Sequence, residues 1–338
     1  MGGCTCETDR PRLVMTLGDL SGVGPELAIK LLSNEENRRK ANIYLMASPA
    51  ELQRFADEQG ATIPTADQFG DGNIVLVESK YADQPVERGV ASVAGGTRVM
   101  SDLLDCLAMF KDGKVDSIMF LPLNKSALHD AGMHEEDELR WFAKELDYHG
   151  TTSELNFAGS LTTSRVTSHC AIKEVSERIN ARSVYEAIRL LDGVIRGSGV
   201  DNPRLGVCAL NPHAGESGQF GREEIDHIAP GIALARNEGM DVEGPFPSDT
   251  IFIAARDGKY DGVVTMYHDQ GQIAMKLMGF DGGVTVQGGL PVPIATPAHG
   301  TAYNIVGQNK ASVGPSQRAF DIAVSLGKRT MEERKAAQ

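Results

Sequence analysis

Short apolar runs alternate along this chain with segments whose apolar residues recur at helical spacing. The runs typical of strands cover residues 12–17, 42–47, 73–77, 117–121, 154–158, 165–168, 204–210, 262–266 and 284–287. The helical patterns cover residues 25–32, 48–59, 95–110, 137–146, 181–196, 222–238 and 316–326. Such alternation predicts an α/β fold, in which largely parallel sheets carry helices on both faces.

The length of the chain favours two lobes. Its 338 residues are enough to bury two hydrophobic cores. Residues 121–125 and 279–289 are candidate crossovers between lobes. We therefore expect one lobe from residues 1–124 and 285–338 and a second from residues 125–284. A chain that crosses twice in this way would leave a cleft between the lobes.

Composition limits the class of partner. The net charge of −13 argues against nucleic acid and anionic membranes, because both select basic surfaces. The chain has no apolar stretch approaching the roughly 18–20 residues of a membrane span. Five cysteines without disulfide-scaffold density, and no secretory signal, indicate a cytoplasmic protein. Cys4 and Cys6 could bind a metal, but one close pair is weak evidence for a site.

Three histidines each follow an apolar run at the point where the chain leaves a predicted strand. They are His169, His213 and His268. Parallel strands bring their carboxyl ends to one edge of a sheet, which is where ligands bind in open α/β folds. Three imidazoles that meet there would hold a divalent metal and leave positions open for a substrate. The neighbouring Asn211, Glu216 and Asp269 could orient these histidines.

Other polar segments allow a structural and a functional interpretation. Residues 17–26, with Gly22 and Gly24, form either a tight strand–helix turn or an anion-binding turn at a helix start. Asp249, in a proline-stiffened loop, is either a helix cap or an acid/base group. Lys276, about two helical turns after His268, is either solvated or directed at an anionic substrate.

Taken together, these segments resemble the 4-hydroxythreonine-4-phosphate dehydrogenase (PdxA) family over most of the chain, from Leu13 to about Val313. The matching motifs lie at 18–26, 123–125, 211–216, 247–250, 267–271 and 299–302. The resemblance implies a two-lobed fold of the isocitrate/isopropylmalate dehydrogenase type. It also implies a homodimer whose active sites use residues of both subunits. The lobe of residues 1–124 and 285–338 would bind NAD, and residues 125–284 would carry the metal, the substrate and the dimer contact.

The resemblance also assigns residue roles. The metal ligands would be His169, His213 and His268, with zinc expected and magnesium, cobalt, nickel or manganese as alternatives. NAD, with NADP as the alternative, would contact Gly18, Asp19, Gly22, Gly24, His299, Gly300, Thr301 and Ala302. The catalytic group would comprise Asp249, Asp269 and Lys276, and the substrate group Lys125, Lys276, Thr285 and Ile294.

Departures from the family pattern concern the substrate phosphate. Thr285 stands at a family asparagine and Ile294 at a family arginine, and residues 136–140 take the place of a Gly-His-Thr-Glu segment. Arginine–phosphate pairs are among the stronger polar contacts. Their loss predicts that the chemistry is kept while the substrate is an unphosphorylated hydroxy acid.

The expected activity is oxidation of a secondary hydroxyl of a hydroxy acid by NAD and a metal. Decarboxylation would follow if a carboxylate lies β to the new ketone. A cis-dihydrodiol dicarboxylate of the terephthalate type is an alternative substrate on the same scaffold. Two rival functions are a three-histidine metal hydrolase, which needs no nucleotide, and a non-enzymatic binding protein derived from the family.

Overall fold

The computed structural model describes residues 9–278 and 283–337, so Cys4 and Cys6 lie outside the described residues. The chain divides into two compact units. Unit 1 comprises Met1–Tyr148 and Leu290–Gln338, and unit 2 comprises His149–Gly289. The predicted α/β class and the two lobes are confirmed.

The expected lobe boundaries need correction. Residues 125–148 belong to unit 1, because Trp141 and Phe142 pack into the same core as Val14. Residues 285–289 belong to unit 2, because Val284–Gly288 pairs antiparallel with Ser153–Ala158. Each boundary is therefore displaced from the predicted one by the burial or the pairing of a short segment.

Unit 1 is built on a parallel sheet of five strands in the order β3-β2-β1-β4-β11. The strands are β1 (Arg12–Thr16), β2 (Asn42–Met46), β3 (Val75–Val77), β4 (Ser117–Phe120) and β11 (Ile294–Pro297). The helices are α1 (Gly24–Ser33), α2 (Glu35–Lys40), α3 (Pro49–Glu58), α4 (Val93–Lys111), α5 (Lys125–Asp130), α6 (Glu138–Glu145) and α12 (Gly314–Ala336), with a 3₁₀ turn at Tyr303–Ile305.

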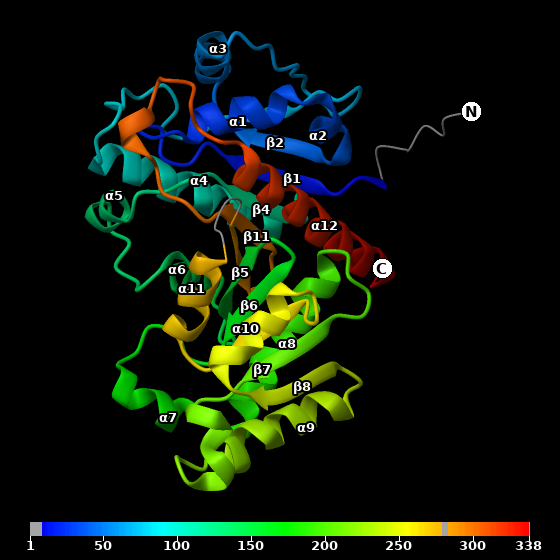
Figure 1. The fold of residues 1–338 in the computed structure, drawn as a ribbon. Helices are drawn as coiled ribbons and strands as arrows, with labels where there is room; N and C mark the ends of the chain where they lie inside the picture. Colours follow the sequence, from blue (N-terminus) through cyan, green and yellow to red (C-terminus); the bar gives the residue numbers. More distant parts are fainter. Residues whose placement is uncertain (1–8, 279–282, 338) are drawn as a thin grey trace. The chain divides into compact units, whose positions relative to one another are not determined.

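Helices cover both faces of this sheet (Figure 1). On one face, Val14, Ile118 and Ile294 pack against apolar residues of α4, α5 and α6. On the other face α12 lies along β11, β4 and β1. Gly327 allows this close packing, because a Cβ at position 327 would clash with the side chain of Ser117. Because successive strand residues point to opposite faces of a sheet, Ser117 faces α12 and Ile118 faces the layer of α4, α5 and α6.

Unit 2 contains six strands in the order β10-β5-β6-β9-β7-β8. They are β5 (Ser153–Ala158), β6 (Leu161–Arg165), β7 (Arg204–Cys208), β8 (Asp241–Phe246), β9 (Gly262–Thr265) and β10 (Val284–Gly288). The pairs β6–β9, β9–β7 and β7–β8 are parallel, and β10–β5 and β5–β6 are antiparallel. The helices are α7 (Val175–Arg178), α8 (Ala181–Gly197), α9 (Ala229–Asn237), α10 (Ser248–Arg256) and α11 (His268–Leu277), with short turns at Ile172–Glu174, Pro212–Gly218 and Glu224–Ile228.

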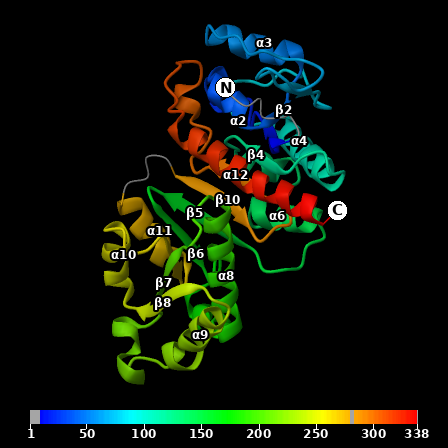
Figure 2. The same cartoon turned by 90° about the vertical axis from the view of Figure 1, so that its right-hand side faces the viewer.

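The sheet of unit 2 also lies between two helical layers. Figure 2 shows α10 and α11 on one side of the strands and α8 and α9 on the other. Ile251, Phe252 and Met275 of the first layer pack with Val263 of β9. On the opposite face Gly262 lets Leu191 and Ile195 of α8 approach the strand closely. The unit therefore presents the carboxyl ends of its parallel strands β6, β9 and β7 at one edge.

The predicted strand 165–168 is wrong in position, because β6 runs from Leu161 to Arg165. Thr162, Thr163 and Ser164 are polar in sequence yet buried, and their ladder to β9 needs no apolar side chain. Beyond β6 the amides of Val166 and Thr167 still donate to the carbonyls of Thr265, the last residue of β9, and of Met266. Within residues 9–278 and 283–337, no helix is both long and apolar enough to cross a membrane.

Candidate functional site

Two of the three singled-out histidines meet at the carboxyl edge of unit 2. His169 follows β6 and His268 follows β9, and these strands are parallel neighbours with Arg165 opposite Thr265. The ring centroids of the two histidines are 5.6 Å apart, with 38° between the planes. Two imidazoles bound to one zinc ion at about 2.0–2.1 Å have centroids roughly 5 Å apart. The pair therefore fits two ligands of a common metal.

His268 is oriented by its own helix start. It is the first residue of α11, and its Nδ1 lies 2.7 Å from Oδ1 of Asp269. A carboxylate on one ring nitrogen favours a proton there, which leaves Nε2 as the nitrogen with a free lone pair. The side chain of Asp269 is 69% exposed, so it stays within reach of solvent or substrate.

Gln270 ties together the chain segments around His268. Its Oε1 accepts the amide proton of Met266 at 2.8 Å, directly after β9. Its Nε2 donates to the carbonyl of Ala209 at 2.8 Å and to Oγ of Ser248 at 2.9 Å. The half-buried side-chain amide of Gln270 thus holds the ends of β9 and β7 and the start of α10 in fixed relative positions.

His213 lies in a turn with unusual backbone geometry. Residues 213–217 all have positive φ, between 45° and 78°, and only Gly215 among them is a glycine. For other residues this left-handed conformation costs roughly 1–2 kcal/mol each, so the surroundings must enforce it. Such outliers cluster at functional sites, and we therefore keep the turn within the candidate site.

Glu224 stabilises the turn through hydrogen bonds to the residues that precede it. This buried carboxylate accepts the amide protons of Leu210 at 2.8 Å and of Asn211 at 2.7 Å. It also accepts from Nδ2 of Asn211 at 3.0 Å. A Cβ on Gly215 would lie 2.7 Å from Oε2 of Glu224, and one on Gly221 would lie 2.4 Å from Nδ2 of Asn211. The Asn211 side chain is thus an anchor of the turn.

The three histidines do not form one cluster in the described part of the chain. There, no group of three or more His, Cys, Asp or Glu side chains is arranged to hold a metal ion. His169 and His268 pair, whereas His213 is exposed on its own turn after β7. The histidines that lie together therefore provide two metal ligands, and His213 as the third ligand remains a prediction.

The two catalytic candidates Asp249 and Lys276 of unit 2 are exposed and lie on helices, whereas the substrate candidate Thr285 lies in a strand. Asp249 is in the first turn of α10, which corrects the expectation of a proline-stiffened loop. Lys276 is in the last turn of α11, on the helix that His268 begins. Thr285, in β10, is half-buried and donates to Oδ1 of Asn156 at 3.4 Å. Only Lys276 among these offers a cation to an anionic substrate.

In unit 1 the two segments expected to bind NAD lie against each other. The amide of Val23 donates to the carbonyl of Thr301 at 3.0 Å, and a Cβ on Gly22 would lie 2.8 Å from the Cβ of Thr301. Gly18 has φ of +67°, and a Cβ there would lie 2.5 Å from the carbonyl oxygen of Leu121. The glycines thus serve close approach between backbones.

Asp19 is buried at the centre of this junction. Its backbone amide donates to the carbonyl of Pro122 at 3.0 Å. Its carboxylate accepts from the amide of Ser21 at 2.9 Å and from the hydroxyl of Tyr303 at 2.6 Å. Burial, together with the hydrogen bond to Asp19, raises the pKa of the Tyr303 phenol above its ordinary value. His299 and Gly300 next to this junction are on or near the surface.

Lys125 lies in a pocket of about 310 Å³ within unit 1. It is the first residue of α5, and Asn124 caps that helix by accepting from Ala127. Carboxylates dominate the rest of the lining: Glu135, Glu136, Asp137 and Glu138. Asp137 is the N-cap of α6, because its Oδ1 accepts from the amide of Arg140 at 2.8 Å. Segment 136–140 therefore begins a helix and contributes carboxylates to the lining that Lys125 shares, while Glu135 is ion-paired with Lys144.

Ile294 does not belong to a substrate site. Its side chain is fully buried in β11, packed in the core of unit 1 with Val14 and Ile118. It cannot reach a substrate from there, so its assignment to the substrate group is corrected. The physical reason is that the position faces the α4–α6 layer, where only an apolar side chain is stable without a partner.

Comparison with known proteins identifies the family. The family model described as "Pyridoxal phosphate biosynthetic protein PdxA" matches residues 29–323. This chain belongs to the PdxA family. A Pseudomonas aeruginosa protein, whose name assigns it provisionally as 4-hydroxythreonine-4-phosphate dehydrogenase 2, is 49% identical over an alignment of 330 positions that covers 94% of this chain and 97% of that protein.

Solved structures of PdxA-type proteins share the fold. A 4-hydroxythreonine-4-phosphate dehydrogenase from Burkholderia phymatum is 30% identical, with a TM-score of 0.78 over 94% of this chain and 98% of that one. A terephthalate 1,2-cis-dihydrodiol dehydrogenase from Burkholderia xenovorans is 27% identical, with a TM-score of 0.70 and the same coverage of both chains. The likeness thus includes proteins named for phosphorylated and for unphosphorylated substrates.

The sequence pattern did not reveal the side chains that hold the candidate site residues in place. Gln270 and Asn211 were within recognised motifs, but their partners Ser248 and Glu224 lie on other elements. Tyr303 follows the His-Gly-Thr-Ala motif directly, and its bond to Asp19 spans 284 positions. The sequence offered one indication of these contacts: a polar side chain in or next to a motif usually forms a hydrogen bond when it is buried.

Proposed function

We propose that this PdxA-family protein is an NAD-dependent and divalent-metal-dependent dehydrogenase that oxidises a secondary hydroxyl of a hydroxy acid. The observation that carries the proposal is the pairing of His169 and His268 at the ends of two parallel strands. Membership of a family whose relatives are named as dehydrogenases supports the reaction class.

The metal would be held by His169 and His268, with His213 as the proposed third ligand. Zinc is our first choice, because imidazole suits it, and magnesium, cobalt, nickel and manganese are the alternatives. A divalent ion at this position supplies Lewis acidity that lowers the pKa of a coordinated hydroxyl.

The chain's own side chains would complete the chemistry. Asp269 holds the tautomer of His268 through its 2.7 Å contact. Asp269 or Asp249, both exposed at helix starts, would accept the substrate's hydroxyl proton, directly or through water. Lys276 would attract a carboxylate or phosphate of the substrate from the same helix as His268.

NAD is the proposed hydride acceptor, with NADP as the alternative. Supporting this, the turn of Gly18–Gly24 and the segment His299–Ala302 form one junction around buried Asp19. Amides at the start of α1 favour an anionic group such as a pyrophosphate. A metal hydrolase on the same histidines would have no use for NAD, so nucleotide binding separates the two functions.

The substrate class rests on the charge around Lys125. Four carboxylates share its pocket, and one of them, Glu135, is ion-paired with Lys144. The remaining negative charge disfavours a dianionic phosphate group near Lys125. We therefore propose an unphosphorylated hydroxy acid, with a cis-dihydrodiol dicarboxylate as the second candidate because of the terephthalate-type neighbour. Because relatives are named for phosphorylated substrates, turnover of such a substrate by this protein would directly contradict the proposal.

We also propose a cytoplasmic homodimer whose active site is shared between subunits. The described residues of one chain gather two histidines rather than three, which supports a contribution from outside the single chain or a shift of the His213 turn. Light scattering on the purified protein would test the dimer. A monomer at micromolar concentration that retains full turnover would contradict the shared site.

The deciding experiment follows NADH formation with the purified protein, NAD and zinc. The substrates are 4-hydroxythreonine-4-phosphate, phosphorylated four-carbon sugar acids, unphosphorylated hydroxy acids and a cis-dihydrodiol dicarboxylate, with CO₂ release measured in parallel. Turnover of unphosphorylated acids alone would support the proposal, whereas turnover of a phosphorylated substrate would overturn the substrate class. Binding of zinc without NADH from any substrate would favour the hydrolase or the non-enzymatic alternative.

A further inference from the structure

A second pocket, of about 700 Å³, lies at the opposite edge of the unit 1 sheet from the proposed NAD junction. Its lining comes from the amino ends of β1, β2, β3 and β4 and from the end of α12. The Gly18–Gly24 turn, by contrast, follows the carboxyl end of β1. The pocket is therefore separate from every residue assigned above to catalysis, metal, substrate or NAD. Its size is within the range of small-molecule sites.

One wall of this pocket is a preorganised cationic cluster. Asp116 is fully buried and receives both Arg12, at 2.8 Å from Nη2, and Arg334, at 3.0 Å from Nη1. The side chains of Arg12 and Arg334 remain 35% and 29% exposed. Two guanidinium groups on one carboxylate leave a net positive charge, and their fixed positions reduce the entropy lost on binding an anion.

Further cations line the same wall, and the bonds around Arg334 fix it firmly. Arg10 and Lys335 also face the pocket. Arg334 additionally donates to the carbonyl of Val115 at 2.7 Å and lies 4.5 Å from the centroid of the Phe110 ring. The Nε–Nη2 edge of Arg12 is already bound to Asp116, so a phosphate would be met by Nη1 of Arg12 and by the guanidinium of Arg10. The wall thus carries four cations, which are partly compensated by Asp116 and by Asp9, whose Oδ1 lies 3.4 Å from Nζ of Lys335; Asp67 adds one further carboxylate to the pocket lining.

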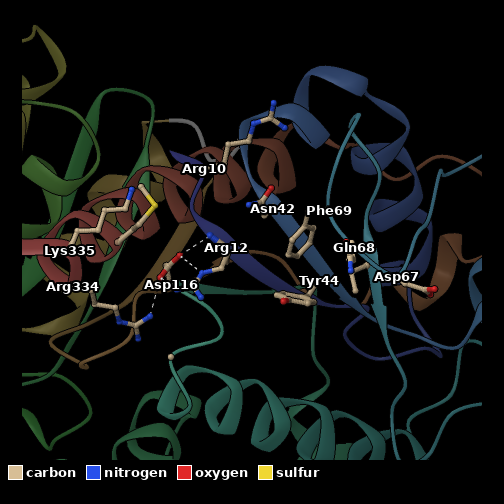
Figure 3. Close-up of a pocket in the computed structure, with 13 residues that line it drawn as sticks. Arg10, Arg12, Asn42, Tyr44, Asp67, Gln68, Phe69, Asp116, Arg334 and Lys335 are labelled. Atoms are coloured by element: carbon tan, nitrogen blue, oxygen red, sulfur yellow. Dashed lines mark hydrogen bonds and ion pairs between the residues drawn. The ribbon is translucent and has the colours of Figure 1, made fainter. Parts of the chain in front are cut away.

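The facing wall is aromatic and carries amides. Tyr44 and Phe69 contact edge to face, with centroids 4.7 Å apart and planes at 74°. Gln68 and Asn42 also line the pocket. Figure 3 shows Arg12, Arg334 and Asp116 on one side and Phe69, Tyr44 and Gln68 on the other, with Arg10 above Asn42 and Asp67 beyond Gln68. An aromatic face flanked by amides suits a planar ring with hydrogen-bonding groups.

We propose that this pocket binds a phosphorylated ligand with a planar heterocycle, of the size of a mononucleotide. The phosphate would lie against Arg10 and the Arg12–Asp116–Arg334 cluster. The ring would lie against Tyr44 and Phe69, with Asn42 and Gln68 bonding its edge. The pocket is positively charged at one end and aromatic at the other, so a ligand needs both a phosphate and a planar ring. Neither the phosphate nor the ring alone should bind well.

The test is calorimetric titration of the full chain with AMP, with adenosine and inorganic phosphate as the partial ligands. AMP is expected to bind at least about tenfold more tightly than either part. The informative variants are Arg10→Ala and Phe69→Leu, each expected to weaken AMP binding at least about tenfold. Arg12 and Arg334 are left intact, because removing either would leave buried Asp116 short of a partner and destabilise the unit.

Matched substitutions in unit 2 control for general effects. Arg182→Ala and Phe220→Leu remove an exposed arginine and an exposed phenylalanine that do not line the pocket and should leave AMP affinity within about twofold. AMP is also part of NAD, so binding at the NAD junction is the main competitor. Affinity that is unchanged in both Arg10→Ala and Phe69→Leu would assign AMP to that junction and overturn the proposal, as would absence of AMP binding in the wild type.

Discussion

At the scale of single residues, the strongest constraints in this protein are backbone approach and buried charge. Gly18 and Gly113 both have φ near +70°, but only Gly18 faces another backbone, that of Leu121. Arg98, Glu51 and Asp102 form a charged group inside unit 1, with Arg98 only 2% exposed. Each feature yields a prediction for which the chain offers its own control.

Gly18→Ala is expected to destabilise unit 1 by about 3 kcal/mol or more. About 1–2 kcal/mol comes from placing alanine at positive φ. The remainder comes from the clash of a Cβ 2.5 Å from the carbonyl oxygen of Leu121. Gly113→Ala has φ of +69° with no atom within 4 Å of the Cβ, so it should show the conformational cost alone. Urea unfolding measures both; equal losses would refute a role for close approach.

Asp102→Asn is expected to gain stability relative to wild type as the pH rises. Burial raises the pKa of Asp102 to about 6, in spite of its 2.7 Å ion pair with Arg98. A carboxyl with a raised folded-state pKa contributes stability below about pH 4 that is lost as the pH rises through 6. The difference between variant and wild type should therefore grow by up to about 3 kcal/mol between pH 4 and 7.

Thermal or urea unfolding at several pH values measures this difference. Asp57→Asn, on the exposed face of α3, is the control, and its difference from wild type should stay flat over the same range. A flat profile for Asp102→Asn as well would show that Arg98 keeps Asp102 ionised throughout.

At the scale of elements, Gln270 holds the site edge of unit 2 through three hydrogen bonds to the ends of β9 and β7 and to α10. We expect Gln270→Ala to weaken zinc binding about 10–100-fold, as removal of outer supports around a metal site does. Gln270→Glu keeps the acceptor for Met266 but loses both donated bonds, so it should not restore affinity. A chromophoric chelator competition measures it, with Gln53→Ala as the control. Zinc affinity unchanged in Gln270→Ala would contradict a positioning role.

The metal pair itself predicts a sharper loss. His268→Ala and His169→Ala should each lower turnover at least about 100-fold, because a Lewis acid contributes several kcal/mol to the transition state. His227→Ala, outside the site on the Glu224–Ile228 turn, should keep wild-type turnover. Near-normal turnover of His268→Ala with bound zinc retained would place the chemistry elsewhere.

The same elements show what sequence could and could not predict. Apolar runs that meet a turn predicted three histidines at one sheet edge; His169 and His268 do lie together there, whereas His213 does not join them among the described residues. The strand β8 was not, because Gly244 and Pro245 interrupt its pattern. β6 was misplaced because Thr162 and Thr163 are buried without being apolar. Propensity describes one residue, whereas burial depends on the partners that a strand finds.

Side-chain roles were predictable only within a motif. The exposure of Ile294 depends on which face of β11 meets α4–α6, which no local pattern reveals. Likewise, the clamp of Glu224 on Asn211 depends on two segments 13 positions apart that share a turn. The His213 turn takes its left-handed form from this tertiary clamp, not from its own sequence preference.

At the scale of the whole molecule, the chain path makes the two units unequal in autonomy. Unit 2 is one continuous segment, His149–Gly289, with its own apolar core between helical layers. Unit 1 is discontinuous, because β11 and α12 return from the end of the chain to pack on β4 and β1. Ile294 in β11 is fully buried in its core, so the first 148 residues alone leave that core open.

We therefore predict that a 149–289 fragment folds cooperatively by itself, whereas a 1–148 fragment does not. The sequence supplies a separate reporter for each case. The single tryptophan, Trp141, is 2% exposed in unit 1, so its fluorescence reports that unit. Unit 2 contains no tryptophan, and its unfolding is followed by circular dichroism. A fusion of 1–148 to 290–338 should restore a blue-shifted Trp141 and a urea transition that 1–148 lacks, because β11 and α12 again cover β4. A native-like Trp141 signal in 1–148 alone would show that the core does not require the returning segment.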